Sequence, residues 1–151
     1  MNQLLSVNCV FVAALHRLHG QAFIAQVIKQ LCASMLTNHS KLLELESQQA
    51  SSEELPEYRT KLKNILNCLI HLYLFQSIGS EFLFSVIHHL LNSFTESDIE
   101  VLIFVLHNIG LQLRKKDPEA IKGILDSFTQ KKNSFQASLK MAGNSATPSF
   151  E

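Results

Sequence analysis

Histidine side chains are the first candidates for chemistry in this chain, because seven are present and imidazole binds metals readily. His16 and His19 are three positions apart, so both would lie on one face of a helix, but no acid or cysteine follows at a spacing that completes a metal site. His88 and His89 are adjacent and would point about 100° apart on a helix, so they cannot chelate one ion together. The pattern favours ordinary surface or core histidines, and we predict no metal site.

The cysteines also give no sign of a metal site or a disulfide framework. Cys9, Cys32 and Cys68 are odd in number, widely spaced and without a CxxC motif. Each lies among apolar residues at helical spacing, as a small buried hydrophobic side chain does. A reducing intracellular compartment is the simplest interpretation.

Motifs that would assign a catalytic role are missing from the sequence. The five glycines are scattered and form no phosphate-binding loop, and no GxSxG, HExxH or paired-carboxylate pattern occurs. A cysteine and a histidine could still meet in space, although nothing in the sequence supports such a pair. We therefore expect no enzyme activity, no catalytic residue, no cofactor and no small-molecule substrate.

The most distinctive charged stretch is HNIGLQLRKKDPEA, residues 107–120, in which Arg114, Lys115 and Lys116 follow an apolar run. Cations in the last turn of a helix are stabilised by the negative end of the helix dipole, so a joint between two helices explains them. These three cations and Lys122 are also candidates for contact with RNA phosphates or an acidic partner. The two interpretations are compatible.

The overall charge is zero, with 13 basic and 13 acidic residues, which argues against a strongly basic nucleic-acid-binding domain. The charge is uneven, because residues 114–140 contain seven cations and three acids whereas residues 1–113 have an excess of acids. An RNA-binding module that uses the basic segment 114–140 is therefore an alternative hypothesis. Aromatic residues beside cations, as a base-stacking platform requires, occur at two places: Tyr58–Arg59, and Phe135 near Lys131 and Lys132. Packing in the core or at its edge is the favoured role for both.

Six amphipathic helices are expected from the periodicity of the apolar residues, which make up 46% of the chain. The stripes span, in chain order, Leu4–Leu18, Phe23–Met35, Leu62–Tyr73, Leu83–Phe94, Ile99–Ile109 and Ile121–Phe128. We expect each stripe to face the core, and the fifth helix, which is apolar nearly all round, to be buried between neighbours. The second helix extends to about Asn38, and its pattern can continue through residues 41–46.

Capping residues mark the joints between these helices. Gly20 and Gly79 can end the first and third helices, and Thr95 can cap the fifth. Asp117 and Pro118 suit the start of the sixth helix, because proline has no N–H to lose at the first position.

The polar stretch SQQASSEELPE predicts a mobile surface loop at 47–57, with Pro56 in the first turn of the third helix. Beyond about Gln136 the apolar stripe fades. We therefore predict a domain at 1–137 and a flexible tail at 138–151.

Short joints and six helices predict an all-α fold, an α-solenoid of about three antiparallel helix pairs, with a compact bundle as the alternative. The apolar stretch at residues 4–15 imitates the core of a signal peptide, but no cation precedes it and it is too short to span a bilayer. We expect a buried helix there and no contact with a membrane.

Two long segments resemble the middle domain of translation initiation factor 4G, and in particular its nucleolar members. They are NCLIHLYLFQSIGSEFLFSVIHHLL (67–91) and FTESDIEVLIFVLHNIGLQLRKKDPEAIKGILDSF (94–128), with a looser match in HRLHGQAFIAQVIKQL (16–31). The resemblance implies stacked HEAT-like helix pairs. It also implies a non-enzymatic scaffold that docks a DEAD-box RNA helicase of the initiation factor 4A type.

For the nucleolar members, the resemblance implies a role in small-subunit ribosome biogenesis and pre-rRNA processing, in the nucleus and nucleolus. RNA and pre-ribosomal particles are further candidate partners. The family domain has about five helix pairs and this sequence about three, so we expect a partial domain that exposes apolar faces at its ends. No helicase-contact residue transfers from the family to this chain. A generic α-solenoid adaptor for another partner is the remaining alternative.

Overall fold

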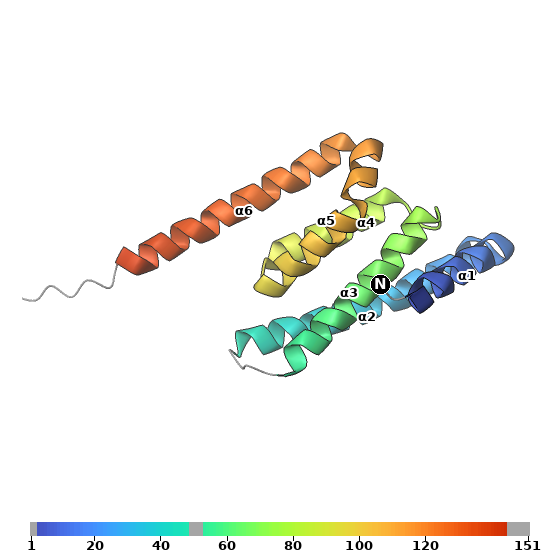
Figure 1. Cartoon of the computed structure of the whole chain (residues 1–151), viewed down its shortest axis with the longest axis horizontal. Helices are drawn as coiled ribbons and strands as arrows, with labels where there is room; N and C mark the ends of the chain where they lie inside the picture. Colours follow the sequence, from blue (N-terminus) through green and yellow to red (C-terminus); the bar gives the residue numbers. More distant parts are fainter. Residues whose placement is uncertain (1–2, 49–52, 145–151) are drawn as a thin grey trace, which may run out of the picture.

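A computed structural model describes residues 3–48 and 53–144, and within these residues the chain forms six α-helices and no strand (Figure 1). In chain order they are α1 (Gln3–His19), α2 (Gln21–Ser47), α3 (Glu54–Leu74), α4 (Ser80–Ser93), α5 (Glu96–Lys116) and α6 (Pro118–Asn144). The predicted all-α class is confirmed.

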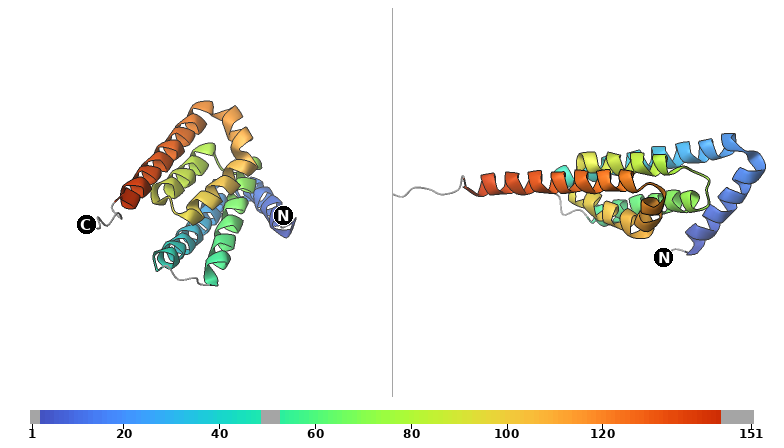
Figure 2. Two further views of the ribbon diagram at one scale, coloured as in Figure 1. Left: turned by 60° about the vertical axis from the view of Figure 1, so that its left-hand side comes forward. Right: turned by 90° about the horizontal axis from the view of Figure 1, so that it is seen from above.

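The helices are stacked as a solenoid rather than closed into a bundle. Each helix packs against the next, and further contacts join α1 to α3, α3 to α5, and α4 to α6. Contacts between helices two apart in the sequence are typical of stacked helix pairs. Figure 2 shows α1 and α6 at opposite ends, with α3, α4 and α5 between them. The predicted solenoid of about three pairs is therefore confirmed.

The middle helices α3, α4 and α5 supply most of the hydrophobic core. Leu62, Leu66, Leu69 and Leu72 of α3 are almost fully buried, and their spacing places them on one side of the helix. The predicted stripes of the third and fourth helices are confirmed. The outer helices α1 and α6 contribute much less to the core, with four buried apolar residues among those described: Cys9, Ala13, Ile121 and Ile124.

The prediction for the first helix was wrong about which side is buried. Leu4 and Leu18 of the predicted core stripe are 69% and 78% exposed, whereas Cys9 and Ala13 are buried. Helix α1 is apolar on both sides, so periodicity alone could not choose between them. The choice is made by α2 and α3, which are the helices that contact α1. The wider apolar face of α1 is left at the surface, in agreement with the expectation for the end of a partial stack.

The prediction for the fifth helix was only partly right. Val101, Leu102 and Val105 are buried, but Ile103 is exposed, because the three helices that contact α5 (α3, α4 and α6) leave part of its surface uncovered. No helix within residues 3–48 and 53–144 combines the length and the apolar character that crossing a membrane requires.

The caps at both ends of α5 follow the prediction. Thr95 forms a capping box with Asp98, in which each residue binds the backbone N–H of the other. Asp117 accepts a hydrogen bond from the N–H of Ala120 at 3.0 Å, and Pro118 is the first residue of α6. The role predicted for Gly79 was wrong, because α3 already ends at Leu74 and Gly79 is instead the residue before α4.

The helices next to the predicted loop are longer than expected. Helix α2 continues through Ser47, and α3 begins at Glu54, which places Pro56 in its first turn as predicted. The mobility of the loop stays a prediction, because residues 49–52 lie outside those described. Helix α6 continues to Asn144, past the predicted boundary at residue 137, since residues such as Gln136, Ala137 and Lys140 favour helix without any stripe. The rest of the predicted tail, 145–151, lies outside the described residues.

Candidate partner-binding surface

The cations predicted as contacts for RNA or a partner lie where α5 meets α6. Arg114, Lys115 and Lys116 form the last turn of α5, and Lys122 lies in the second turn of α6. All four side chains are exposed. Their predicted position at a joint between two helices is confirmed, and their role as contacts stays a prediction. We call these four residues the basic corner.

Asp117 is the single residue that joins the two helices of the basic corner. Its N–H donates a hydrogen bond to the carbonyl of Leu113 at 2.8 Å, which closes α5. Its carboxylate binds the N–H of Ala120 and so begins α6. The sequence order of cations, acid and proline therefore places the basic corner at the joint between α5 and α6.

The charges of the basic corner are available to a partner. The ion pairs found among the described residues involve none of its four cations. The Lys116 Nζ atom lies 5.2 Å from the centroid of the Tyr73 ring, a cation–π contact that restrains this side chain. Consecutive helix positions point about 100° apart, so the three cations of α5 fan out rather than converge. This arrangement suits a broad contact with phosphates or an acidic surface, not a small ligand held at one point.

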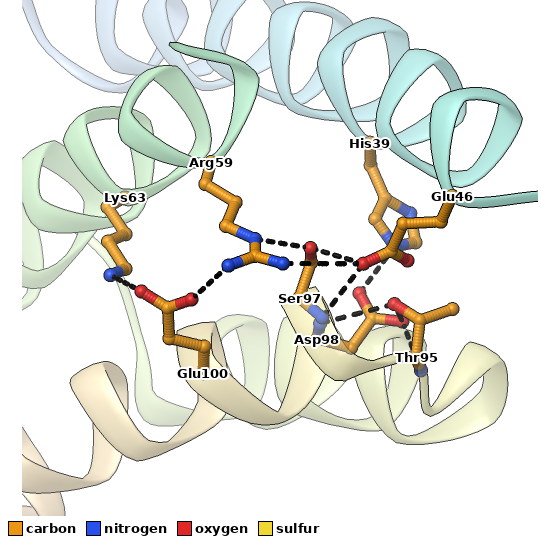
Figure 3. A network of polar contacts seen from close by, with 8 residues as sticks. All are labelled: His39, Glu46, Arg59, Lys63, Thr95, Ser97, Asp98 and Glu100. Atoms are coloured by element: carbon orange, nitrogen blue, oxygen red, sulfur yellow. Dashed lines mark hydrogen bonds and ion pairs between the residues drawn. The ribbon is translucent and has the colours of Figure 1, made fainter. Parts of the chain in front are cut away.

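A polar network ties α2, α3 and α5 together and fixes the start of α5 (Figure 3). Arg59 of α3 donates to Ser97 at 2.6 Å and to Glu100 at 2.8 Å, both on α5. Glu46 of α2 accepts hydrogen bonds from the N–H and the hydroxyl of Ser97. Lys63 pairs with Glu100 as well, and this hydrogen bond is the main reason that the pKa of Glu100 is lowered. These side chains connect helices of successive pairs and are occupied with one another.

A second set of buried polar contacts lies beside this network and centres on Asp98. The His39 Nε2 atom of α2 lies 2.7 Å from the Asp98 Oδ1 atom, and both side chains are buried. The other ring nitrogen of His39 lies 3.1 Å from Nε2 of His89 on α4. Burial raises the pKa of Asp98, but hydrogen bonds from His39 and Thr95 outweigh it and hold that pKa below its ordinary value.

These polar contacts account for charged residues that the sequence left without an assignment. Arg59, which stands beside Tyr58 in the sequence, is engaged with α5 and is not part of an aromatic platform. The ammonium group of Lys61 lies 4.7 Å from the centroid of the Tyr58 ring instead. The network is therefore structural, and it positions α5, whose last turn belongs to the basic corner.

The sequence missed an apolar groove along α1, because its stripe was expected to be buried. The groove has a volume of about 430 Å³ and is lined by Val10, Ala13, Ala14, Arg17, Leu18 and Phe75. The sequence did contain a signal for this groove. A helix with apolar residues on two sides, placed at the end of a stack, must leave one apolar side at the surface.

A second apolar groove lies between α6 and the start of α5, and the sequence pointed to part of it. Phe135, noted beside Lys131 and Lys132, is exposed and lines this groove together with Phe94, Phe128 and Lys132. The rings of Phe94 and Phe128 meet edge to face, with centroids 5.5 Å apart. An exposed ring with a nearby cation can receive an aromatic or an apolar side chain.

Metal binding finds no support in the geometry of residues 3–48 and 53–144. No three histidine, cysteine or acidic side chains of that part of the chain come together as metal ligands would.

The helical stack and its exposed surfaces define a scaffold domain, and the comparison with known families gives its class. The MIF4G domain family matches the chain over residues 3–144, so this chain belongs to that family. The match covers all six helices. No solved structure gives a significant match.

Among individual proteins, the chain is similar to Nucleolar MIF4G domain-containing protein 1 from Mus musculus, with 35% identity over 65 residues, which are 43% of this chain and 8% of the relative. The Homo sapiens protein of the same name is 36% identical over 62 residues, 41% of this chain and 7% of the relative. Suppressor of glycerol defect protein 1 from Schizosaccharomyces pombe is 27% identical over 125 residues, 83% of this chain and 15% of the relative. The matched part of the chain thus spans less than a sixth of each relative.

Proposed function

We propose that this chain is a non-enzymatic helical scaffold that docks a DEAD-box RNA helicase of the initiation factor 4A type. Its proposed setting is the nucleolus, in small-subunit ribosome biogenesis and pre-rRNA processing. The observation that supports this most is the match to the MIF4G domain family over residues 3–144. Two similar proteins are named as nucleolar, which supports the proposed location.

The geometry suits docking because the middle of the stack is rigidly connected while several surfaces stay open. The polar network holds α2, α3 and α5 in one arrangement. The basic corner and the two apolar grooves lie on surfaces that no other described helix covers. A macromolecular partner therefore meets a preformed surface, which lowers the entropy cost of binding.

The experiment is a pull-down of the purified chain with a factor-4A-type helicase, with and without nucleotide, at low and raised salt. The triple variant R114A/K115A/K116A is expected to weaken binding about tenfold, because three charges at the contact are lost. The control K29A/K41A/K61A removes the same charge elsewhere, from exposed Lys29 and Lys61 and partly exposed Lys41, and is expected to bind as wild type.

Failure of the folded wild-type chain to bind any helicase of this type would refute the docking proposal. A generic α-solenoid adaptor for another partner would then be the better description. Equal weakening by both triple variants would show a general effect of charge and remove the basic corner from the proposal.

A direct contact with RNA is a second candidate, favoured by one specific observation. All seven cations between Arg114 and Lys140 are exposed, and the ion pairs found among the described residues use none of them. Binding to single-stranded RNA without helicase should then weaken with salt, with a log–log slope of about −2 or steeper for three or more phosphate contacts. A flat salt dependence, or no binding, would eliminate this candidate.

A further inference from the structure

Two cysteines from distant parts of the sequence meet between the first helix and the central one. Cys9 of α1 and Cys68 of α3 are 59 positions apart, yet their sulfur atoms lie 3.2 Å from each other. A disulfide bond is about 2.05 Å long, so the two sulfur atoms need to approach by only about 1.2 Å. Helices α1 and α3 are in direct contact, so the fold already holds the two side chains next to each other.

The surroundings of the two thiols differ in a way that assigns them different roles. Cys9 is 1% exposed, whereas Cys68 is only partly buried and is the more accessible residue of the pair. The Cys9 S–H donates a hydrogen bond to the Cys68 sulfur. This bond lowers the pKa of Cys68 in spite of its burial, and the same bond together with burial raises the pKa of Cys9. A thiolate is the nucleophilic form of cysteine, so Cys68 is the residue that reacts first.

We propose that Cys9 and Cys68 are an oxidation site that forms a reversible disulfide when hydrogen peroxide reaches Cys68. The Cys68 thiolate attacks one peroxide oxygen, the O–O bond breaks, and Cys68 becomes a sulfenic acid. The released hydroxide takes up the proton that Cys68 lost and leaves as water. The Cys9 sulfur then attacks the Cys68 sulfur, the S–S bond forms, and the S–O bond breaks. The proton of Cys9 leaves with that hydroxyl group as a second water, so two thiols are oxidised and one peroxide is reduced.

The disulfide acts on an outer helix that contributes little to the core. Of the described residues of α1, only Cys9 and Ala13 are buried apolar side chains, so little apolar burial opposes its detachment. A covalent bond from Cys9 to α3 ties α1 to the centre of the stack and keeps its apolar face in place. The bond also restricts the unfolded chain, because it closes a long loop. This site is independent of the proposed helicase docking.

The test exposes the reduced full-length chain to stoichiometric hydrogen peroxide and follows it by mass spectrometry without reductant. The expected product has lost two hydrogens, and trypsin releases residues 1–17 linked to residues 64–114. The melting temperature of the oxidised chain should rise by roughly 5–15 °C and return after treatment with dithiothreitol.

Two variants separate this pair from the third cysteine. C32S removes a thiol of α2 that is not in the pair, and it should form the same link with the same gain in melting temperature. C9A should give no link. Cys68 should react more slowly in this variant, because it has lost the hydrogen bond that lowers its pKa, but any oxygen that it takes up should stay there for want of a resolving thiol.

Three results would overturn the proposal. They are oxygen added to Cys68 of the wild-type chain without any link, a link that contains Cys32, and a correct link without a rise in melting temperature. The first two reject the oxidation site, and the third rejects its effect on α1.

Discussion

The middle of the stack and its first helix are made from similar amphipathic helices, yet they are held in different ways. Helix α3 buries a continuous series of leucines and also exchanges hydrogen bonds and ion pairs with α5. Helix α1 buries two apolar residues among those described and leaves two of its four leucines, Leu4 and Leu18, exposed. An apolar stripe therefore predicts a helix well, but only a neighbouring helix turns the stripe into core.

The two regions also differ in what they contribute: the middle fixes how the helices stack, and the ends offer surfaces for a partner. Buried polar groups tolerate few partners, because an unpaired one costs desolvation energy, so the contacts of Asp98 and Ser97 select one way of stacking α2 and α3 against α5. Apolar side chains on α1 impose no such requirement. The ends are thus free to meet a partner without disturbing the middle.

The largest expected effect is a direct test of this difference with the same substitution in both regions. L69A should lower the free energy of unfolding by about 3–4 kcal/mol, because it empties space in the core. L18A removes an exposed side chain and should change that free energy by less than about 0.5 kcal/mol. Urea titration followed by circular dichroism measures both. Similar losses in the two variants would mean that α1 is part of the core.

The next effect concerns the buried carboxylate. D98A removes the partner of His39 and half of the capping box, so we expect a loss of about 2–3 kcal/mol. The free energy of unfolding from urea titration at neutral pH measures this loss. T60A, which removes an exposed hydroxyl that binds only its own helix, is the matched control and should cost much less.

The same carboxylate makes stability depend on pH. Its pKa is lower in the folded protein than in the unfolded chain, so the contribution is complete above the unfolded value of about 3.9 and is lost as pH falls through the folded value. Acidification from pH 6 to pH 3 should therefore destabilise wild type more than D98A, and urea titration at the two pH values measures this difference. Parallel stability curves for the two proteins would exclude this role.

A smaller effect is expected at the joint between α1 and α2. Gly20 has a φ of +76°, which residues with a side chain rarely adopt, so G20A should cost about 1–3 kcal/mol. Gly79 has a φ of −83° and open space around it, and G79A should stay within about 0.5 kcal/mol of wild type. Hydrogen exchange of α1 amides, compared with those of α3, would show whether the damage is confined to the first helix. Equal costs in the two variants would contradict the backbone argument.

The smallest effect on stability is expected at the basic corner. R114A/K115A/K116A should lower the free energy of unfolding by less than about 1 kcal/mol, because exposed cations gain little from the helix dipole. Thermal and urea unfolding measure this change. A large loss would mean that these cations serve the fold rather than a partner.

Local signals in the sequence predicted much of this fold. The Thr95 capping box, the Asp117–Pro118 start of α6 and the leucine stripe of α3 depend on residues a few positions apart, and each lies where expected. The basic corner was located in the same way, from the order of cations, acid and proline.

The features that the sequence did not predict depend on contacts between distant residues. His39 and Asp98 are 59 positions apart, and so are Cys9 and Cys68, so no local pattern could pair them. The buried side of α1 was missed for the same reason, since α2 and α3 decide it. The two apolar grooves are lined by residues that lie far apart in the sequence, so no local pattern could predict them either.

The single-glycine joint before α2 makes α1 a lever. A helix of 17 residues is about 26 Å long, so a turn of roughly 10° at Gly20 would move its far end by about 4–5 Å. Cys9 lies about 17 Å from that joint along the helix axis. A bond at that distance from the joint resists rotation of α1 more effectively than a contact of equal strength close to Gly20. The direction in which the apolar face points is thus governed by one pair of backbone angles and by one pair of sulfur atoms.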